Sequence, residues 1–375
     1  MTDYDLQDRK FWLANENEIK EGRTTDMYFV NTKEVLQKNN VDADVVMEVY
    51  ARELPYPQNW GILTGVYEAA KLLEGLPVDV WSFEEGGVFV ADSSSVIYEP
   101  LMVIAGKYGA FAEYETPLLG LLSSSTSVST RAARFKVAAG EKLLFSFGTR
   151  RVHPALAPMV ERASYLAGFD GVSNVLGAEL LHLKASGTMP HALIQVVGDQ
   201  ESAWKMYDKT IASDSPRVAL VDTFWDEKTE AVKAFEVLGS NLWGVRLDTP
   251  ASRRGESVGK LKDIADGFGV GTAVAYPPVI DLSAKIVEVR RGAKREFRAK
   301  RGGLGGRKAV YRSSVGFQDT VVLEGADAPL GTKAMLTPLL KNGKIVRKYE
   351  GVDAIRSRVL RDLHLLPKHP PSISW

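Results

Sequence analysis

The chain has 375 residues, a length typical of two domains or of one barrel with an appended domain. Lysine plus arginine and aspartate plus glutamate both number 47, so the formal net charge is zero, which excludes a global basic field for nucleic acid. The absence of cysteine excludes disulfides, thiolate metal sites and cysteine nucleophiles, and it fits a cytoplasmic protein. The charged N-terminus and the lack of a long apolar run predict neither a signal peptide nor a membrane partner.

The first third of the chain is rich in short β-forming runs. Residues 78–111 alternate such runs with Gly-Gly and Ser-Ser breaks, a pattern that predicts antiparallel hairpins. A long helical stretch follows over residues 116–140 and leads toward the middle of the chain. We therefore predict an N-terminal α+β domain over residues 1–118.

The middle of the chain alternates strand-like and helix-like segments. The pattern predicts strands at 142–147, 169–174, 217–224 and 242–250, and helices at 153–168, 175–183, 199–211 and 226–239. The last of these helices stops at a glycine, Gly239, which is a common C-terminal signal. Repeated strand–turn–helix units are typical of parallel sheets, so the expected fold class is α/β, with a catalytic α/β barrel over residues 119–278.

After about Pro278 the chain returns to mixed short elements. We expect residues 279–375 to pack with the N-terminal domain and to complete a second α/β unit. Residues 294–312 (KREFRAKRGGLGGRKAVYR) carry many cations among glycines. We interpret this run as a solvated loop.

Polar residues follow the predicted strands of the middle segment, where a parallel barrel holds its catalytic groups. They are Arg150, Arg151 and His153, then Ser186, Thr188 and His191, then Asp222 and Thr223, then Arg246, Asp248 and Thr249, and finally the turn GFGVGT over 267–272. Arginines match phosphate or carboxylate oxygens in pairs, glycine turns bring backbone N–H groups close to phosphate, and strand-end aspartates suit Mg²⁺ or ribose hydroxyls. The set indicates recognition of a phosphorylated, polyanionic sugar.

Each of these features also has a structural interpretation. Arginines often form surface ion pairs, strand-end aspartates cap turns or helices, and a lone histidine commonly completes a structural hydrogen bond. Glycine-rich turns are common between strands and helices. It is the whole set, at one end of one predicted barrel, that favours an anion-binding barrel enzyme.

Several segments, in order along nearly the whole chain, resemble the nicotinate phosphoribosyltransferase family in its shorter archaeal-type form. The matching segments are TTDMYF, FSFGTRRVHPALAPMVERASYLAGFDGVSNVLGAELL, SGTMPHALI, LVDTFWDEK, GVRLDTPASRRG, GFGVGT and KRGGLGGRKAVYR. DGVSNVLGAE followed by GTMPHAL is the most specific part. The resemblance implies the type II phosphoribosyltransferase fold, an irregular α/β barrel joined to a flanking α/β domain. It also implies transfer of phosphoribose from phosphoribosyl pyrophosphate to nicotinate, which gives nicotinate mononucleotide for NAD salvage.

The resemblance also implies roles for single residues. The pyridine ring would stack between Phe147 and Tyr28 of the partner subunit, and Arg150 or Arg151 would bind its carboxylate. The acid and metal-facing roles would fall to Asp248 and Asp222. Substrate phosphates and ribose would be held by a further set: Thr188, Arg246, Thr249, Gly269 and Gly271.

His191 would be the residue that ATP phosphorylates during coupled turnover, because a neutral imidazole is a competent nucleophile toward phosphorus. The alternative is that His191 only hydrogen-bonds a diphosphate oxygen. The implied cofactors are Mg²⁺, bound with pyrophosphate near Asp248, and ATP as a co-substrate. The implied partners are nicotinate, phosphoribosyl pyrophosphate and a second copy of the chain, in a homodimer or a higher homo-oligomer with shared active sites.

The chain departs from the family pattern in two places. Thr249 and Gly267 are eighteen positions apart, too few for the complete βαβ unit of roughly 30 residues that relatives carry there. Either a strand and its Gly-Gly phosphate turn are missing between Arg254 and Gly267, or the sequence omits an interior stretch. The lack of cysteine also rules out the zinc knuckle of some relatives, and His364 and His369 alone form a poor zinc set.

Three other functions stay open. Quinolinate phosphoribosyltransferase would need more cations for a second carboxylate. Nicotinamide phosphoribosyltransferase would place an acid near the ring, and Glu179 is close to that place in the motif. A non-catalytic nucleotide-binding relative would keep the fold and lose the chemistry.

Overall fold

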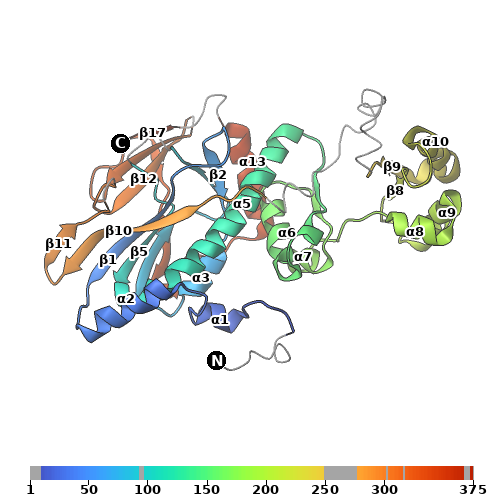
Figure 1. Ribbon diagram of the computed structural model, residues 1–375. Coiled ribbons are helices and arrows are strands. Elements are labelled where there is room, and N and C mark those ends of the chain that lie inside the picture. Colours follow the sequence, from blue (N-terminus) through green and yellow to red (C-terminus); the bar gives the residue numbers. More distant parts are fainter. Residues whose placement is uncertain are drawn as a thin grey trace.

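The computed structural model describes residues 10–92, 97–248, 277–300, 303–315, 317–366 and 372–374 (Figure 1). Thr249, Gly269, Gly271 and the shortened segment from Arg254 to Gly267 lie outside the described residues. None of the helices in the described part combines the length and hydropathy needed to span a bilayer.

A seven-stranded antiparallel sheet combines strands from both ends of the chain. Its order is β11 (Lys294–Phe297), β10 (Leu282–Arg291), β1 (Asp44–Ala51), β5 (Met102–Lys107), β3 (Val78–Ser82), β15 (Thr337–Lys341) and β16 (Lys344–Ile345). β10 therefore lies beside β1, although more than two hundred residues separate them. The prediction that N-terminal and C-terminal segments build one domain is confirmed; the domain boundaries themselves stay predictions.

Helices cover one face of this sheet, and smaller sheets complete the domain. The helices are α1 (Glu16–Lys20), α2 (Met27–Lys38), α3 (Val66–Leu73), α4 (Tyr108–Phe111) with η2 (Ala112–Tyr114), and α5 (Glu115–Ala139). Apolar residues of α3 and α5 share one core with β1, β3 and β5. The smaller sheets are β14 (Thr332–Ala334), β12 (Lys308–Ser313), β13 (Gln318–Leu323) and β17 (Ser372–Ser374) in that order, and the pair β2 (Trp60–Leu63) with β4 (Gly87–Val90).

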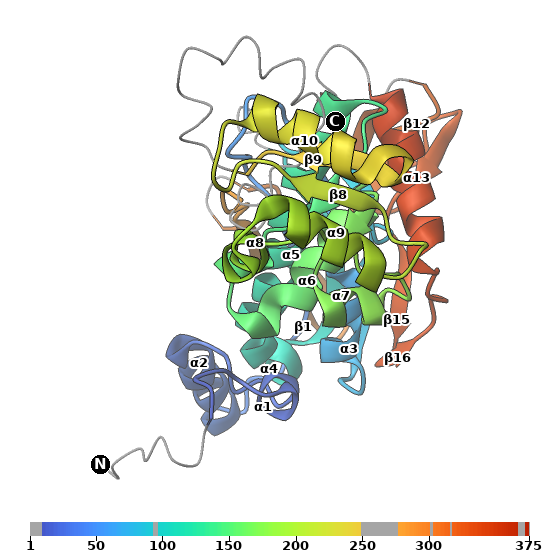
Figure 2. The same cartoon turned by 90° about the vertical axis from the view of Figure 1, so that its right-hand side faces the viewer.

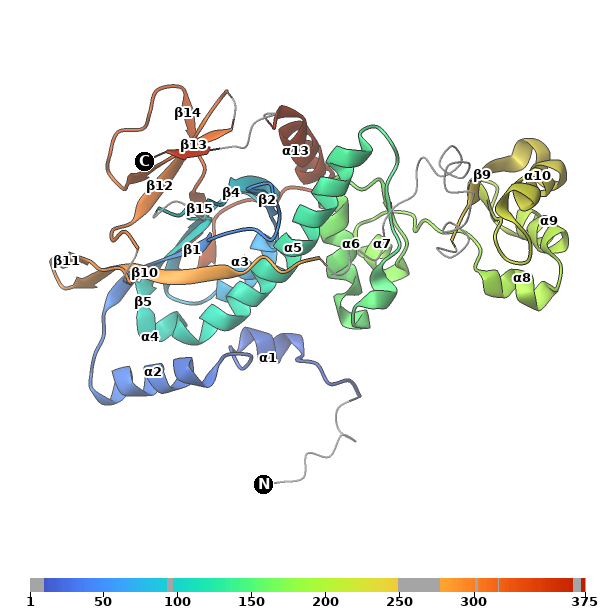
Figure 3. The ribbon, with the colours of Figure 1, turned by 45° about the horizontal axis from the view of Figure 1, so that its top comes forward.

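The long helix α5 was predicted from the sequence, and its many hydroxyl residues have a structural use. Ser129 donates its Oγ proton to the carbonyl of Ile62 at 2.8 Å, and Thr130 Oγ1 accepts the N–H of Ile62 at 2.9 Å. The helix thereby satisfies backbone groups of β2 along the edge that β4 does not pair. α5 then runs from the sheet to α6 (Ala157–Leu166) and α7 (Val175–Leu180), as Figure 3 shows.

Residues 294–312 correct the loop interpretation. They contribute β11 and most of β12, and Lys308 is almost fully buried, with Nζ 2.7 Å from Glu48 Oε2. In the two strands, Arg295 pairs with Glu288 and Arg312 pairs with Asp319. The solvated-loop interpretation is therefore wrong for β11 and β12.

Every strand pair described between residues 119 and 248 is parallel, as the β/α pattern predicted. β6 (Phe145–Ser146) pairs with β7 (Gly171–Val172), and β8 (Arg217–Leu220) pairs with β9 (Leu242–Arg246). The strands are shorter than predicted. Helices flank them: α6 and α7, α8 (His191–Val197), α9 (Gln200–Thr210) and α10 (Glu227–Leu238), with single turns η3 (Thr149–Arg151), η4 (Pro154–Leu156) and η5 (Gly239–Asn241). α13 (Val352–Leu365) returns to pack on α6.

The unit formed by β8, β9 and α8–α10 lies at the end of the molecule away from the large sheet (Figures 1 and 2). Its core contains Trp204, Ala219, Leu220 and Ala234, all without measurable exposure. The α/β class and the two-part plan predicted from the sequence are thus confirmed.

Candidate active site

Two aspartates meet at the carboxyl ends of β8 and β9. The parallel register pairs Leu220 with Arg246, so the residues two positions further on, Asp222 and Asp248, come side by side. The backbone N–H of Asp248 donates to Asp222 Oδ2 at 2.6 Å. The Asp222 side chain is only 2% exposed, whereas that of Asp248 is 40% exposed. Asp222 is therefore buried and holds the backbone of Asp248, whereas the carboxylate of Asp248 is accessible to solvent.

His191 faces both carboxylates from the first turn of α8. Its Nε2 atom lies 3.4 Å from Asp248 Oδ2 and 3.7 Å from Asp222 Oδ1. On the other side of the ring, Nδ1 lies 3.0 Å from Thr223 Oγ1. Pro190, in an extended conformation, precedes the helix, so the Gly-Thr-Met-Pro run turns the chain and starts α8 at the histidine.

Arg246 links this acidic pair to the segment before His191. Its guanidinium lies 2.9 Å from Asp248 Oδ2 and donates to Thr188 Oγ1 at 2.7 Å and to the carbonyl of Met189 at 3.3 Å. The guanidinium group has five N–H donors in one plane, so it can bind these three acceptors and still present N–H groups to a ligand.

Residues that follow β6 and β7 also belong to the site. The N–H of Ser186 donates to the carbonyl of Val172 at 2.8 Å, which joins the segment before His191 to the end of β7. Gly171 permits this approach, since a Cβ there would lie 2.6 Å from the Phe145 ring and 2.9 Å from Ser186 Oγ.

These groups line one hollow of about 410 Å³. Its lining comprises Phe147, Arg150, Ser173, Ser186, Gly187, Thr188, Pro190, His191, Ala192, Arg246 and Asp248. The hollow thus combines an exposed aromatic ring, two arginines, small hydroxyl residues, an imidazole and a carboxylate. Such a set suits a ligand with a flat ring and several anionic oxygens.

The structure separates the predicted residues into three groups. Phe147, Arg150, Thr188, His191, Arg246 and Asp248 line the hollow, and Asp222 lies directly beneath it. Arg151 and Glu179 do not line it; Glu179 is exposed on α7. Tyr28, 59% exposed on α2, packs against Phe29 and does not line the hollow of its own chain.

Ser173 was missed by the sequence reasoning. It follows β7 directly, and its backbone N–H donates to the carbonyl of Ser146 at 3.1 Å. Its place at the carboxyl end of a predicted strand was the signal that could have identified it.

The described residues contain no cluster of three or more histidine and carboxylate side chains arranged to hold a metal alone. The chemistry of the donors nevertheless fits Mg²⁺, which commonly binds one or two carboxylates and completes its shell with water and substrate phosphates. Asp248 and the carboxylate beneath it would supply those oxygens.

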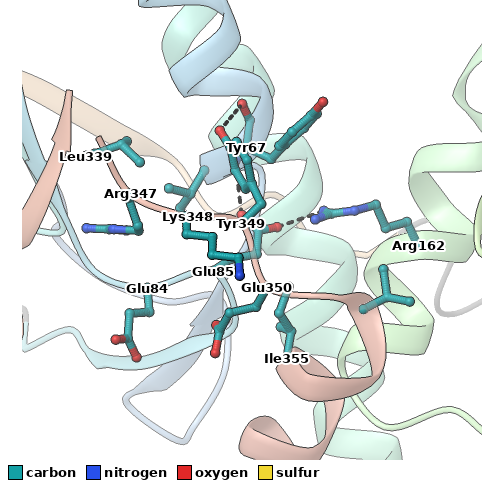
Figure 4. Close-up of a pocket in the computed structure, with 12 residues that line it drawn as sticks. Tyr67, Glu84, Glu85, Arg162, Leu339, Arg347, Lys348, Tyr349, Glu350 and Ile355 are labelled. Carbon is teal, nitrogen blue, oxygen red and sulfur yellow. Dashed lines mark hydrogen bonds and ion pairs between the residues drawn. The ribbon is translucent and has the colours of Figure 1, made fainter. Parts of the chain in front are cut away.

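A second hollow, of about 420 Å³, lies between α3, α6 and α13 (Figure 4). Its arginines already serve internal acceptors: Arg347 donates to the carbonyls of Ser82, Phe83 and Thr337, and Arg162 donates to Glu85 at 2.7 Å. Glu84 and Glu350 add negative charge to its lining. This hollow is less suited to a polyanion than the one at His191.

Comparisons with known proteins agree with this geometry. Family profiles described as "Quinolinate phosphoribosyl transferase, N-terminal domain" and "C-terminal domain" match residues 26–126 and 128–268. A nicotinate phosphoribosyltransferase of Mycobacterium tuberculosis is 24% identical, over 92% of this chain and 87% of that protein. One of Bacillus subtilis is 27% identical over 60% of this chain, and the match spans only about half (51%) of that protein.

Among solved structures, the chain resembles one described as nicotinate-nucleotide pyrophosphorylase from Pyrococcus furiosus. The two share 44% sequence identity with a TM-score of 0.88, over 95% of this chain and 98% of that one. Taken together with the motif residues that converge at His191, these matches assign the chain to the nicotinate phosphoribosyltransferase family, enzymes with the type II phosphoribosyltransferase fold.

Proposed function

We propose that this enzyme transfers the phosphoribosyl group of phosphoribosyl pyrophosphate to nicotinate, releasing pyrophosphate and forming nicotinate mononucleotide for NAD salvage in the cytoplasm. The convergence of Arg246, Asp248 and His191 on one hollow that also contains Phe147 carries the proposal. The matched Pyrococcus furiosus structure is named for pyrophosphorolysis of nicotinate nucleotide, which is the same reaction in reverse.

In the proposed reaction, the pyridine nitrogen attacks C1′ of the ribose while the bond from C1′ to pyrophosphate breaks. The transition state carries positive charge on the ribose and negative charge on the leaving group. Asp248 would stabilise the ribose cation, and Arg246 would stabilise phosphate oxygens. Mg²⁺, held near Asp248 and Asp222, would neutralise charge on the departing pyrophosphate. Thr249, Gly269 and Gly271 remain proposed phosphate ligands by resemblance alone.

Phe147 and Arg150 would select the acceptor. Phe147 is 44% exposed, so its ring is open to stacking by an electron-poor pyridine. Arg150, in the same lining, would pair with the nicotinate carboxylate. Glu179 lies away from the hollow, which favours the acid over its amide.

Competition among nicotinate, nicotinamide and quinolinate tests this choice: nicotinate should have the highest kcat/KM. Phe147→Ala should raise the KM for nicotinate far more than that for the phosphosugar. An unchanged nicotinate KM would mean that the ring binds elsewhere.

We further propose that ATP phosphorylates His191 at Nε2 during coupled turnover. When Nδ1–H donates to Thr223 Oγ1, the lone pair of Nε2 is free to attack the γ-phosphorus. The N–P bond forms as the P–O bond to ADP breaks, and water later hydrolyses the phosphohistidine.

His191→Ala should abolish ATP stimulation and leave slow ATP-independent transfer. Equal loss of both activities would instead indicate a histidine that only binds diphosphate.

We propose that the working unit is a homodimer, or a larger homo-oligomer, in which Tyr28 of the partner subunit completes the ring slot. Two observations support this: Tyr28 is exposed, and α7 presents Val175, Leu176 and Leu180, each more than half exposed. Tyr28→Ala and Phe147→Ala chains, each impaired alone, should regain activity when mixed, because one site of each mixed dimer is intact. Formation of mixed dimers without recovery would contradict the shared site.

The competing possibility of a non-catalytic nucleotide-binding relative has its own test. Titration calorimetry with phosphoribosyl pyrophosphate and Mg²⁺, followed by addition of nicotinate, separates the two functions. Binding without release of pyrophosphate would favour the non-catalytic protein.

A further inference from the structure

A buried glutamate on α10 holds the loop that carries Thr223. Glu230 has no measurable exposure, and its carboxylate accepts three successive backbone N–H groups. Oε2 accepts from Thr223 at 3.4 Å, and Oε1 accepts from Phe224 at 3.1 Å and from Trp225 at 2.6 Å. The loop that follows β8 is thereby tied to one side chain from the helix that it precedes.

These bonds are not needed to start α10. Asp226 caps the helix, because its side chain accepts the N–H of Thr229 at 3.0 Å. The side-chain bonds of Glu230 instead reach backward, to residues that precede the helix. Glu227, one turn earlier on α10 and also buried, accepts none of these three loop N–H groups.

The loop that Glu230 holds contacts His191 directly, through Thr223. Thr223 Oγ1 lies 3.0 Å from Nδ1 of the ring, and the opposite nitrogen, Nε2, faces Asp248. A shift of the Thr223 backbone therefore moves the hydroxyl that holds Nδ1, and so changes the balance between this nitrogen and Nε2, which faces the carboxylates of Asp248 and Asp222. No bond from Glu230 to His191 is required for this effect.

We propose that Glu230 is a positioning residue that fixes the ring orientation and tautomer of His191 through Thr223. The inference rests on the proposed role of His191 as the group that receives phosphate. Glu230 touches neither substrate nor the reacting atoms; it presets the loop, so that the ring is held with Nδ1 toward Thr223 and Nε2 toward Asp248 before substrates bind.

Glu230→Gln tests this geometry with little change in shape. The carboxylate accepts on both oxygens, whereas an amide has one accepting oxygen and one NH₂ group. If the amide oxygen keeps Phe224 and Trp225, its NH₂ group meets the N–H of Thr223, and two donors oppose each other. The loop should then move at Thr223, the residue next to the ring.

The readout that does not depend on activity is the tautomer of His191. With ¹⁵N-labelled histidine, the five histidines of the chain give few signals, and His191→Ala assigns the one of interest. We expect Glu230→Gln to shift the His191 tautomer population toward that of a free imidazole. Glu227→Gln, the matched control on the same helix, should leave it unchanged.

A double-mutant cycle separates positioning from general loosening. Thr223→Val removes the hydroxyl that transmits the effect, so adding Glu230→Gln to Thr223→Val should change neither the tautomer nor kcat further. In the parent background, Glu230→Gln should lower ATP-stimulated kcat about 10- to 100-fold and change the KM for phosphoribosyl pyrophosphate by less than about 3-fold. Glu230→Asp, which keeps the charge on a shorter side chain, should give an intermediate result.

Two outcomes would overturn the inference: an unchanged His191 tautomer in folded Glu230→Gln and Glu230→Asp, or equal effects of Glu230→Gln with and without Thr223. If the parent enzyme fails to transfer phosphoribose to nicotinate, the proposed function fails. The tautomer measurement still decides the role of Glu230 in that case.

Discussion

Two arginines at opposite ends of the same parallel strand pair should respond in opposite ways to replacement by lysine. Arg217 begins β8 and Arg246 ends β9. Arg217, 8% exposed, donates to four backbone carbonyls, those of Asp208, Ile211, Ala212 and Ser215, at 2.6–2.7 Å. Arg246 is more exposed and holds side chains of the candidate site.

The expected magnitudes follow from these contacts. The ammonium of lysine directs its donors from one point and cannot reach four carbonyls, so Arg217→Lys should lose at least two bonds, or about 2 kcal/mol of stability. Arg246→Lys keeps the charge in a partly exposed site, and its cost in stability should stay below about 1 kcal/mol. It loses the planar fork, however, and kcat/KM for phosphoribosyl pyrophosphate should fall about 10- to 100-fold, equivalent to about 1.4–2.8 kcal/mol.

Urea unfolding and steady-state kinetics, measured on both variants, test the pair of expectations together. Arg217→Lys should lower the urea midpoint and keep kcat/KM within about 3-fold of the parent; Arg246→Lys should do the reverse. The reasoning is refuted if Arg246→Lys keeps full kcat/KM, or if both variants lose stability and activity in the same proportion.

Three other expectations concern stability and metal dependence. Lys308→Met leaves the Glu48 carboxylate buried without its cation, and should cost about 3–5 kcal/mol in urea unfolding, most of it recovered by adding Glu48→Gln. Burial raises the pKa of Glu115 to about 7. The folded protein therefore binds the proton of Glu115 more tightly than the unfolded chain does. The stability that this protonated carboxyl contributes is complete below the unfolded pKa of about 4.5 and is lost as pH rises toward 7. The loss should be no more than about 3 kcal/mol, and less where water screens the carboxyl. Urea midpoints at about pH 5 and about pH 8 should converge in Glu115→Gln, and an undiminished difference would exclude this residue as the cause. Chelation of Mg²⁺ should stop turnover and leave the melting temperature unchanged, because substrate phosphates are needed to complete the metal's ligand set; a large drop in melting temperature would indicate a structural metal.

The sequence alone determined the local order of elements in the middle of the chain and the chemistry of the candidate site. Strand–turn–helix units repeat with clear hydrophobic periods, and residues at strand ends share one edge whenever the strands are parallel. For this reason Asp222, Arg246 and Asp248 could be grouped from the sequence alone. His191 was grouped with them through the segment SGTMPH, which in the structure leads into a helix and not out of a strand. The hydrophobic period of a segment is a local property of its sequence, and it does not depend on which other segments pack against it.

Only the tertiary structure decided which residues from distant segments lie next to each other. Arg150 lines the hollow and Arg151 does not; Asp222 is buried beneath Asp248; Lys308 pairs with Glu48 across 260 positions. Glu230 resembles any helical glutamate in the sequence, and only the folded loop brings three N–H groups to it. Pairings of this kind are set by long-range packing, because a buried charge or backbone group must find its partner wherever the chain brings one within reach.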